Sequence, residues 1–389
     1  MGARNVSRLQ LLYDKFPSHR FLAMFPVRTS LLTRPIKLFP WRFMKLRQYL
    51  NKLSVVVILT ALAVVASTSQ AIAQQQPGED DVYENQERAA VTGFVASAGT
   101  LAEARNGGNL LDVWRANDST NQVWLSWNNG SPFTIASTTQ TFVSPAVVAI
   151  GNSGFMVFHT GTDGNIYRSL VTGNRVFTPW VSVPGNTTNM TVSVAQMGAG
   201  SPNIYMVYRG SGGDTQVWGT WMNSSFEWSS PINIAGGLAN ASPAICLNNT
   251  GSSLWVVVVG TDNQIWTTSQ FLGAPSWPFF TPRGVFAGGL PPSCAATAAG
   301  TEVMAYVDGN GNPNYASFDN AGNMVTGWTR DRSGYRTQRS VNLSSSGNTV
   351  WSLLTGDQVN CQLPPLGPPV NTPCFPVNQI YWKQVYVAP

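Results

Sequence analysis

The sequence predicts an all-β protein made of repeated four-stranded units, and two observations predict it. Aromatic residues return about every 48 positions in two parallel series, and a fixed period in this range is typical of repeat architectures. The intervals hold short β-branched and aromatic runs separated by Gly, Asn, Asp or Pro, which predict strands joined by tight turns. The first series is Trp124, Tyr167, Trp218, Trp266, Tyr315 and Tyr381, and the second is Phe133, Trp180, Trp228, Trp277 and Trp328.

The clearest copy of the unit lies between residues 144 and 180. Its strands are predicted at Ser144–Ile150, at Phe155–Phe158, in a segment ending at Tyr167, and at Phe177–Trp180. Glycine- or Asn-containing turns separate them, and the same order recurs in the later copies. Each copy is therefore expected to form one small sheet.

The last copy is interrupted, and we expect the N-terminal region to complete it. Strands are predicted at Val350–Leu354 and Asn378–Tyr381, with a Pro-rich insertion between them and no room for a fourth strand afterwards. Val91–Phe94 resembles Val325–Trp328, the predicted fourth strand of the fifth copy. Residues 90–97 are thus predicted to supply the missing strand and bring the two ends of the domain together.

Small sheets repeated around a closed ring form a β-propeller, in which only short, protected strand edges remain. Six units of about 48 residues and the insertion fill residues 88–389. We predict a six-bladed β-propeller with four-stranded blades; seven blades are the alternative. Residues 74–87, rich in Gln and acidic side chains, are predicted to form a flexible linker.

The chain begins with a basic leader. Basic residues between Lys45 and Lys52 precede an apolar run from Leu53 to Ala66, and small residues end the leader at Ala73. This order is typical of a cleaved secretory signal, and the run is shorter than the roughly 20 residues that a membrane span needs. We interpret Met44 as the true start; an unusually long n-region is the alternative. The mature protein is expected to be secreted or periplasmic, without a membrane span.

The net charge of +5 comes from the leader alone. Residues 1–73 hold 11 of the 23 Lys and Arg residues but a single acid, Asp14, so the remainder has 12 basic and 17 acidic residues and a net charge of −5. A nucleic acid is therefore not an expected partner.

All four cysteines lie beyond the leader, where export permits disulfides. Cys361 and Cys374 bracket the Pro-rich insertion, and Cys246 and Cys294 lie at nearly the same point of neighbouring copies. Both pairs are candidates, but four cysteines allow three connectivities. The absence of a C-x-x-C pattern argues against a zinc site.

Catalysis is not expected. The mature chain has one His, His159, and no G-x-S-x-G motif, so a serine triad lacks support. A glycoside hydrolase needs two facing carboxylates, and the candidates Glu103, Asp112, Glu302 and Asp308 lie in the first and fifth copies. We predict no catalytic residue, cofactor or metal.

One family shares the pattern of the unit. Ser144–Trp180 and Ser242–Trp277 follow S-P-A, a strand, G-T-D-x-x-I-Y/W and a later Trp, and Thr191–Trp228 follows it less closely. This resembles the propeller repeats of bacterial fucose-binding and methylated-sugar-binding lectins, the Photorhabdus-type lectin-like propellers. The resemblance implies a non-catalytic propeller that binds a glycan or surface polymer between its blades. A structural or protein-interaction propeller is the alternative, and a glycoside hydrolase a further one; the number of protomers stays open.

Ligand-binding candidates are the aromatic and basic side chains least explained by packing. Sugars offer apolar faces to aromatic rings and hydroxyls to polar groups. Trp127 and Trp221 lie three residues after a core aromatic and so face the other side of the strand. The further candidates are Arg168, Trp180, Trp228 and Trp277. Turn aspartates four residues before the aromatic are predicted to bond their own backbone; they are Asp163, Asp214 and Asp262.

Overall fold

A computed structural model of the protein describes residues 101–116, 119–135, 140–198, 200–248, 250–331, 336–355 and 380–387. All of them belong to the compact unit Ile72–Pro389. The predicted leader, linker, closing strand at residues 90–97 and the pair Cys361 and Cys374 lie outside the described residues. The part of the chain that the structure describes holds no apolar helix of membrane-spanning length.

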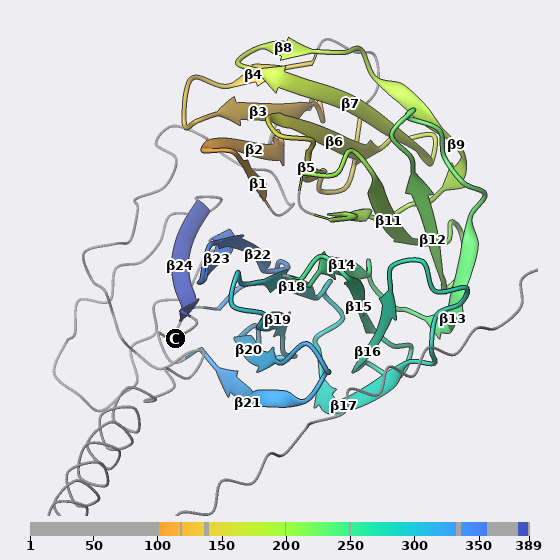
Figure 1. The fold of residues 1–389 in the computed structure, drawn as a ribbon, viewed down its shortest axis with the longest axis vertical. Helices are drawn as coiled ribbons and strands as arrows, with labels where there is room; N and C mark the ends of the chain where they lie inside the picture. Colours follow the sequence, from red (N-terminus) through yellow and green to blue (C-terminus); the bar gives the residue numbers. More distant parts are fainter. Residues whose placement is uncertain are drawn as a thin grey trace, which may run out of the picture. The chain divides into compact units, whose positions relative to one another are not determined.

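The described strands form six antiparallel sheets around a common centre, which confirms the predicted six-bladed β-propeller (Figure 1). Four of the six blades have four strands in sequence order. The strands are, for the first blade, β1 (Ala102–Asn106), β2 (Asn109–Arg115), β3 (Val123–Trp127) and β4 (Phe133–Thr134); for the second, β5 (Ala146–Ile150), β6 (Gly154–Thr160), β7 (Asn165–Gly173), β8 (Val176–Phe177) and β9 (Val181–Thr187); for the third, β10 (Ser193–Gln196), β11 (Ile204–Arg209), β12 (Gln216–Met222) and β13 (Ile232–Leu238); for the fourth, β14 (Ala244–Leu247), β15 (Ser253–Val259), β16 (Gln264–Phe271) and β17 (Thr281–Phe286); for the fifth, β18 (Ser293–Ala296), β19 (Glu302–Val307), β20 (Pro313–Phe318) and β21 (Met324–Arg330); and for the sixth, β22 (Asn342–Ser346), β23 (Thr349–Thr355) and β24 (Ile380–Val387).

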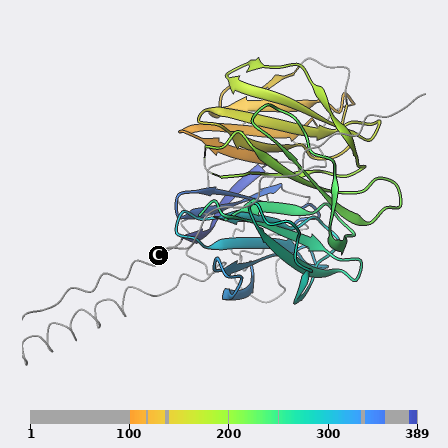
Figure 2. The same ribbon diagram turned by 45° about the vertical axis from the view of Figure 1, so that its right-hand side comes forward.

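The first strand of each blade is innermost, and these strands contact one another in a closed ring. β22 of the sixth blade meets β1 of the first, where Asn342 Nδ2 donates a hydrogen bond of 2.9 Å to the Leu101 carbonyl. Figure 2 shows the same blades from a second angle, with β1 again beside the last blade. The sixth blade has three described strands, so its completion by residues 90–97 stays a prediction.

The second blade differs from the predicted unit in its outer strand. The single strand expected at Phe177–Trp180 is replaced by β8 and β9, which both pair with β7. Pro179 lies between them and has no N–H to continue the ladder, so the pairing breaks there. Trp180 consequently lies in the connection between β8 and β9 instead of in a strand.

The outer strands share a bulge. β9, β13 and β17 each carry a glycine in the left-handed region, at φ of 71° for Gly185, 67° for Gly236 and 70° for Gly284. The register with the neighbouring strand shifts beside each of them. A residue with a Cβ is disfavoured there, so these glycines set where each outer strand bends.

In the fifth blade, Tyr315 lies one residue further from the preceding turn than the aromatic residues of the first series do in the first four blades. In the second blade the turn closes with a hydrogen bond from Gly161 N to Asn165 O, and Tyr167 follows two residues later. In the fifth blade the corresponding bond ends at Asn312, and Tyr315 follows three residues later. Tyr315 therefore does not occupy the strand position that the 48-residue period assigns to it.

The offset has a structural consequence because successive side chains on a strand point to opposite faces. Tyr315 turns towards the sixth blade, where its hydroxyl lies 2.9 Å from Ser352 Oγ. It is fully buried in the cluster that joins the fifth and sixth blades. It packs the core, as expected of this series, but on the opposite face.

Candidate functional site

The turn aspartates fix the aromatic side chains that follow them. Asp214 Oδ1 accepts a hydrogen bond from the backbone N of Gln216 (2.9 Å), and its Oδ2 accepts one from Trp218 Nε1 (2.9 Å). Asp163 and Asp262 make the equivalent bonds to the residues two and four positions on. These carboxylates are engaged within their own blades and are poor candidates for contact with a ligand.

The interface between the second and third blades gathers hydrogen-bond donors that have no partner within the described ranges of the chain. Arg168 leaves β7 towards the third blade, and its Cζ lies 5.6 Å from the ring centroid of Phe226. No described residue bonds its buried Nε, and burial lowers the pKa of the guanidinium. Trp228 packs edge-on against Phe158, with ring centroids 6.0 Å apart, and its buried Nε1 is also unpartnered among the described residues.

Phe226 is the residue of this interface that sequence reasoning missed. It lies in the tight turn that joins β12 to β13, with a φ of 63°. This left-handed conformation is uncommon for a bulky side chain, and 39% of the residue is exposed. An aromatic residue within a turn of Asn, Ser and Glu was the available signal. Its ring partner, Arg168, is far away in the sequence, so the pairing itself left no pattern.

The interface between the third and fourth blades is internally satisfied. Gly219 takes the strand position of Arg168, and a Cβ there would lie 2.7 Å from the Tyr205 hydroxyl. That hydroxyl accepts a hydrogen bond of 3.0 Å from Trp277 Nε1. Trp221 stacks on Tyr205 with centroids 6.4 Å apart and is 40% exposed. Trp277 is thus a packing residue, whereas Trp221 presents a ring to solvent.

The interface between the first and second blades is packed by its aromatic side chains. Trp127 contacts Phe155 edge-on at 5.4 Å, and Trp180 contacts His159 edge-on at 4.5 Å. His159 is 1% exposed, and burial lowers its pKa to about 4. It is therefore neutral near pH 7 and enclosed by rings, a poor position for a catalytic base.

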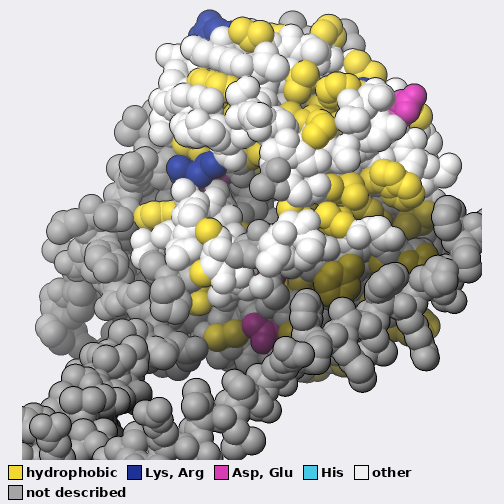
Figure 3. All heavy atoms as spheres, viewed as in Figure 1, with side chains coloured by type: hydrophobic (Ala, Val, Ile, Leu, Met, Phe, Trp, Pro, Cys, Tyr) yellow, Lys and Arg dark blue, Asp and Glu magenta, His cyan; other side chains and the backbone are white. Residues whose placement is uncertain are grey.

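Charged side chains are sparse on the face of the molecule shown in Figure 3, where the described surface is mostly uncharged. Among the described residues, no group of three or more His, Cys, Asp and Glu is arranged to hold a metal ion. A ligand that recognises this face would do so through uncharged polar and apolar groups.

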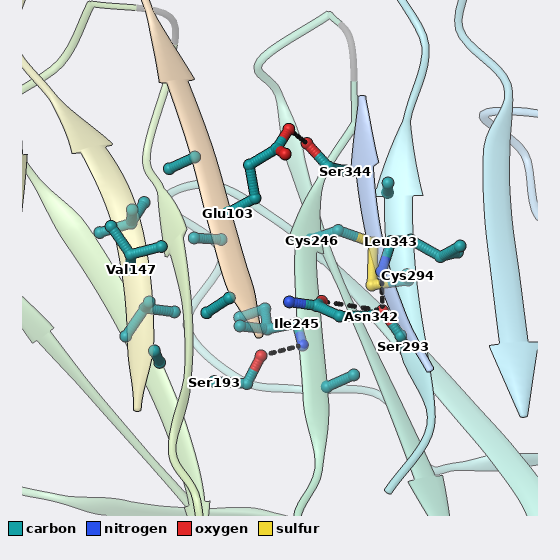
Figure 4. A pocket seen from close by; sticks show the side chains of 18 of the residues that line it. Glu103, Val147, Ser193, Ile245, Cys246, Ser293, Cys294, Asn342, Leu343 and Ser344 are labelled. Atoms are coloured by element: carbon teal, nitrogen blue, oxygen red, sulfur yellow. Dashed lines mark hydrogen bonds between the residues drawn. A yellow bond between two sulfur atoms is a disulfide. The ribbon is translucent and has the colours of Figure 1, made fainter. Parts of the chain in front are cut away.

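A central cavity of about 320 Å³ is lined by the six innermost strands (Figure 4). Cys246 and Cys294 form a disulfide across its wall and join β14 to β18. Glu103 points from β1 to Ser344 on β22, whose Oγ donates a 2.8 Å hydrogen bond to Glu103 Oε1. The cavity wall thus links neighbouring blades by a covalent bond at one place and by a hydrogen bond at another.

Only one of the four candidate carboxylates for glycoside hydrolysis lines this cavity, and it is Glu103. Asp112 and Glu302 are fully buried elsewhere, without hydrogen-bond partners among the described residues. Asp308 accepts bonds from the backbone of Asn310 and Asn312 in a turn. The described residues therefore do not place two carboxylates opposite each other across the cavity, as hydrolysis requires.

The buried carboxyl of Glu302 is expected to make the stability of the protein depend on pH. Burial, aided by the charge of Asp319, raises its pKa from 4.5 to about 7. The folded state then holds this proton more tightly than the unfolded state, so stability falls as the pH rises from about 4.5 to about 7. Glu302→Gln is expected to be more stable than the wild type at pH 8, by about 1–3 kcal/mol, and close to it at pH 4. Urea unfolding at both pH values measures this.

The exposed Glu227, which accepts a hydrogen bond from Asn223, provides the control for that measurement. Glu227→Gln should follow the pH profile of the wild type. A Glu302→Gln profile that runs parallel to the wild type between pH 4 and pH 8 would contradict the prediction.

No family model matches the chain, and no curated protein matches it. Solved structures do. The fucose-specific lectin from Aleuria aurantia shares 14% identity, with a TM-score of 0.50, over 67% of this chain and 88% of that one. The BP39L lectin from Burkholderia pseudomallei shares 15% identity, with a TM-score of 0.51, over 68% and 80%. At these identities the likeness shows a common fold, the β-propeller.

Proposed function

We propose that this propeller binds carbohydrate without catalysis at interfaces between its blades, foremost between the second and third. One observation carries the proposal. The Arg168 guanidinium lies against the exposed ring of Phe226. Its Nε, and the Nε1 of Trp228 at the same interface, have no partner among the described residues.

The chemistry of this interface suits a neutral sugar. A sugar's hydroxyl and ring oxygens accept hydrogen bonds from a guanidinium, and its C–H face packs on an aromatic ring. Trp221, exposed at the next interface, offers a second ring of this kind. The name of the Aleuria aurantia lectin states fucose specificity, so fucose-bearing glycans are the first probes to use.

We also propose that the protein is exported. The leader has the order of a secretory signal, and the Cys246–Cys294 bond suits an oxidising compartment. Export would bring the propeller to glycans outside the cell or in the periplasm.

Arg168→Ala is expected to weaken glycan binding about 10- to 100-fold, because hydrogen bonds from a charged group contribute about 1.5–3 kcal/mol. The wild type is first screened on a glycan array, and the affinity of each variant for the best ligand is then measured by calorimetry. Arg175→Ala is the matched control, since Arg175 is an exposed arginine in a turn of the same blade. Circular dichroism checks that both variants fold.

Equal affinity of Arg168→Ala and Arg175→Ala would place the ligand elsewhere. A wild type that binds no array glycan would instead favour the protein-interaction propeller, which predicts a retained protein partner and no sugar affinity.

A further inference from the structure

The lining of the central cavity is unlike that of the blade interfaces. Among the described residues that line it, the two charged side chains are Glu103 and Arg105, both on β1, and none is aromatic. The other lining residues are apolar or carry small polar groups such as the hydroxyls of Ser193, Ser293 and Ser344. Any ligand held here would be recognised chiefly by the Glu103–Arg105 pair.

The pair is fixed in place. Glu103 Oε1 accepts hydrogen bonds from Arg105 Nε (2.9 Å) and from Ser344 Oγ (2.8 Å). The Glu103 side chain is 1% exposed, whereas that of Arg105 is 37% exposed. The carboxylate is therefore held between the first and sixth blades, and it orients the guanidinium through Nε. This arrangement keeps both groups preorganised without a ligand.

The remaining polar atoms of the pair make no hydrogen bond to another described residue. No described residue donates to Glu103 Oε2, and none accepts from the Nη atoms of Arg105. An acceptor and a pair of donors thus lie side by side at the wall of a cavity. A hydroxyl group can both donate and accept, so two adjacent hydroxyls of one molecule match this pair.

The charge balance favours a neutral ligand over an ion. The positive and negative groups cancel within the pair. Asp112 faces Glu103 across the β1–β2 ladder, and burial raises the pKa of its carboxyl well above the usual value, which favours the neutral form of that carboxyl. An anion would meet the Glu103 carboxylate, and a cation the guanidinium.

We propose that the central cavity is a second ligand site, distinct from the blade interfaces, which takes one small neutral polyol through adjacent hydroxyls bound to Glu103 and Arg105. The volume of about 320 Å³ is at the lower end of small-molecule sites and fits a monosaccharide. The site would hold a free sugar while the blade interfaces hold an attached one.

The test is calorimetric titration of free D-glucose into the full chain, with D-glucuronate as the charged comparison and intrinsic fluorescence read in parallel. The wild type should bind glucose with a dissociation constant of about 1–10 mM and glucuronate at least about 5-fold more weakly. Because no Trp is among the described residues that line the cavity, the fluorescence should stay unchanged. Glu103→Gln and Arg105→Ala should each weaken glucose binding about 10-fold or more.

Arg175→Ala, at an exposed turn residue of the second blade that does not line the cavity, is the control and should leave glucose binding unchanged. The two proposals are tested by different variants, Glu103→Gln for glucose in the cavity and Arg168→Ala for array glycans at the blade interface, so the failure of one does not imply failure of the other. Glu103→Gln keeps the side-chain volume and the acceptor for Ser344, and it decides the outcome if Arg105→Ala does not fold. Absence of saturable glucose binding to the wild type overturns the proposal, and so does loss of that binding in Arg175→Ala or its retention in Glu103→Gln.

Discussion

Replacing Tyr315 with alanine is expected to destabilise the propeller by about 3–5 kcal/mol, the range for truncating a large buried aromatic side chain. Tyr315 is 0% exposed and is among the largest fully buried side chains of the described residues. It fills the space between the fifth and sixth blades, so its removal leaves a cavity that rigid strands on both sides cannot close. Urea unfolding followed by circular dichroism measures the loss.

Tyr315→Phe is the matched control for that experiment. It keeps the ring and removes only the hydroxyl that lies 2.9 Å from Ser352 Oγ, which is expected to cost about 0.5–1.5 kcal/mol. The difference between the two variants isolates packing from hydrogen bonding. Equal losses in Tyr315→Ala and Tyr315→Phe would show that the ring itself contributes little at this interface.

Removing the Cys246–Cys294 disulfide is expected to lower the free energy of unfolding by about 2–4 kcal/mol. The bond joins residues 48 positions apart, so it restricts a long loop of the unfolded chain and excludes many of its conformations. The double variant Cys246→Ala and Cys294→Ala is compared with the oxidised wild type by chemical unfolding. Replacing both residues avoids a lone thiol in the cavity wall.

A reductant provides the control for the disulfide. It should shift the wild type towards the double variant by the contribution of this bond, while the shift of the double variant itself reports any other reducible pair. Equal free energies of unfolding for the oxidised wild type and the double variant would contradict the prediction.

The sequence predicted the features that repeat, because every blade needs the same strands, the same turns and an aromatic side chain that packs against the neighbouring blade. Blade number and strand order followed from the period. The period made Cys246 and Cys294 a candidate pair but left the connectivity open, and the structure shows that they are bonded. Tyr315 lies one residue further from its turn than Tyr167 does, and this extra residue turns it to the other face of the strand. A shift of one residue cannot be recognised in a repeat of about 48 residues whose length varies between copies. Side-chain direction depends on that single residue.

The candidate ligand-binding residues stay predictions, and the structure gives them different surroundings. Arg168 lies at the interface of the second and third blades against Phe226, whereas Trp127, Trp180 and Trp277 contact other aromatic rings. Phe226 was missed because its role arises only where two blades meet. Contacts between blades join residues without a fixed separation in sequence, so a repeat pattern does not encode them.

The six innermost strands meet at six interfaces, and these interfaces are not held together in the same way. The interface between the fourth and fifth blades is covalent through Cys246 and Cys294. The interface between the first and sixth depends on hydrogen bonds from Asn342 and Ser344, and the chain segments it unites are at opposite ends of the domain. One interface of the ring is therefore covalent, and the interface that closes the ring is held by noncovalent contacts alone. We expect the blades to separate first where the two ends of the domain meet.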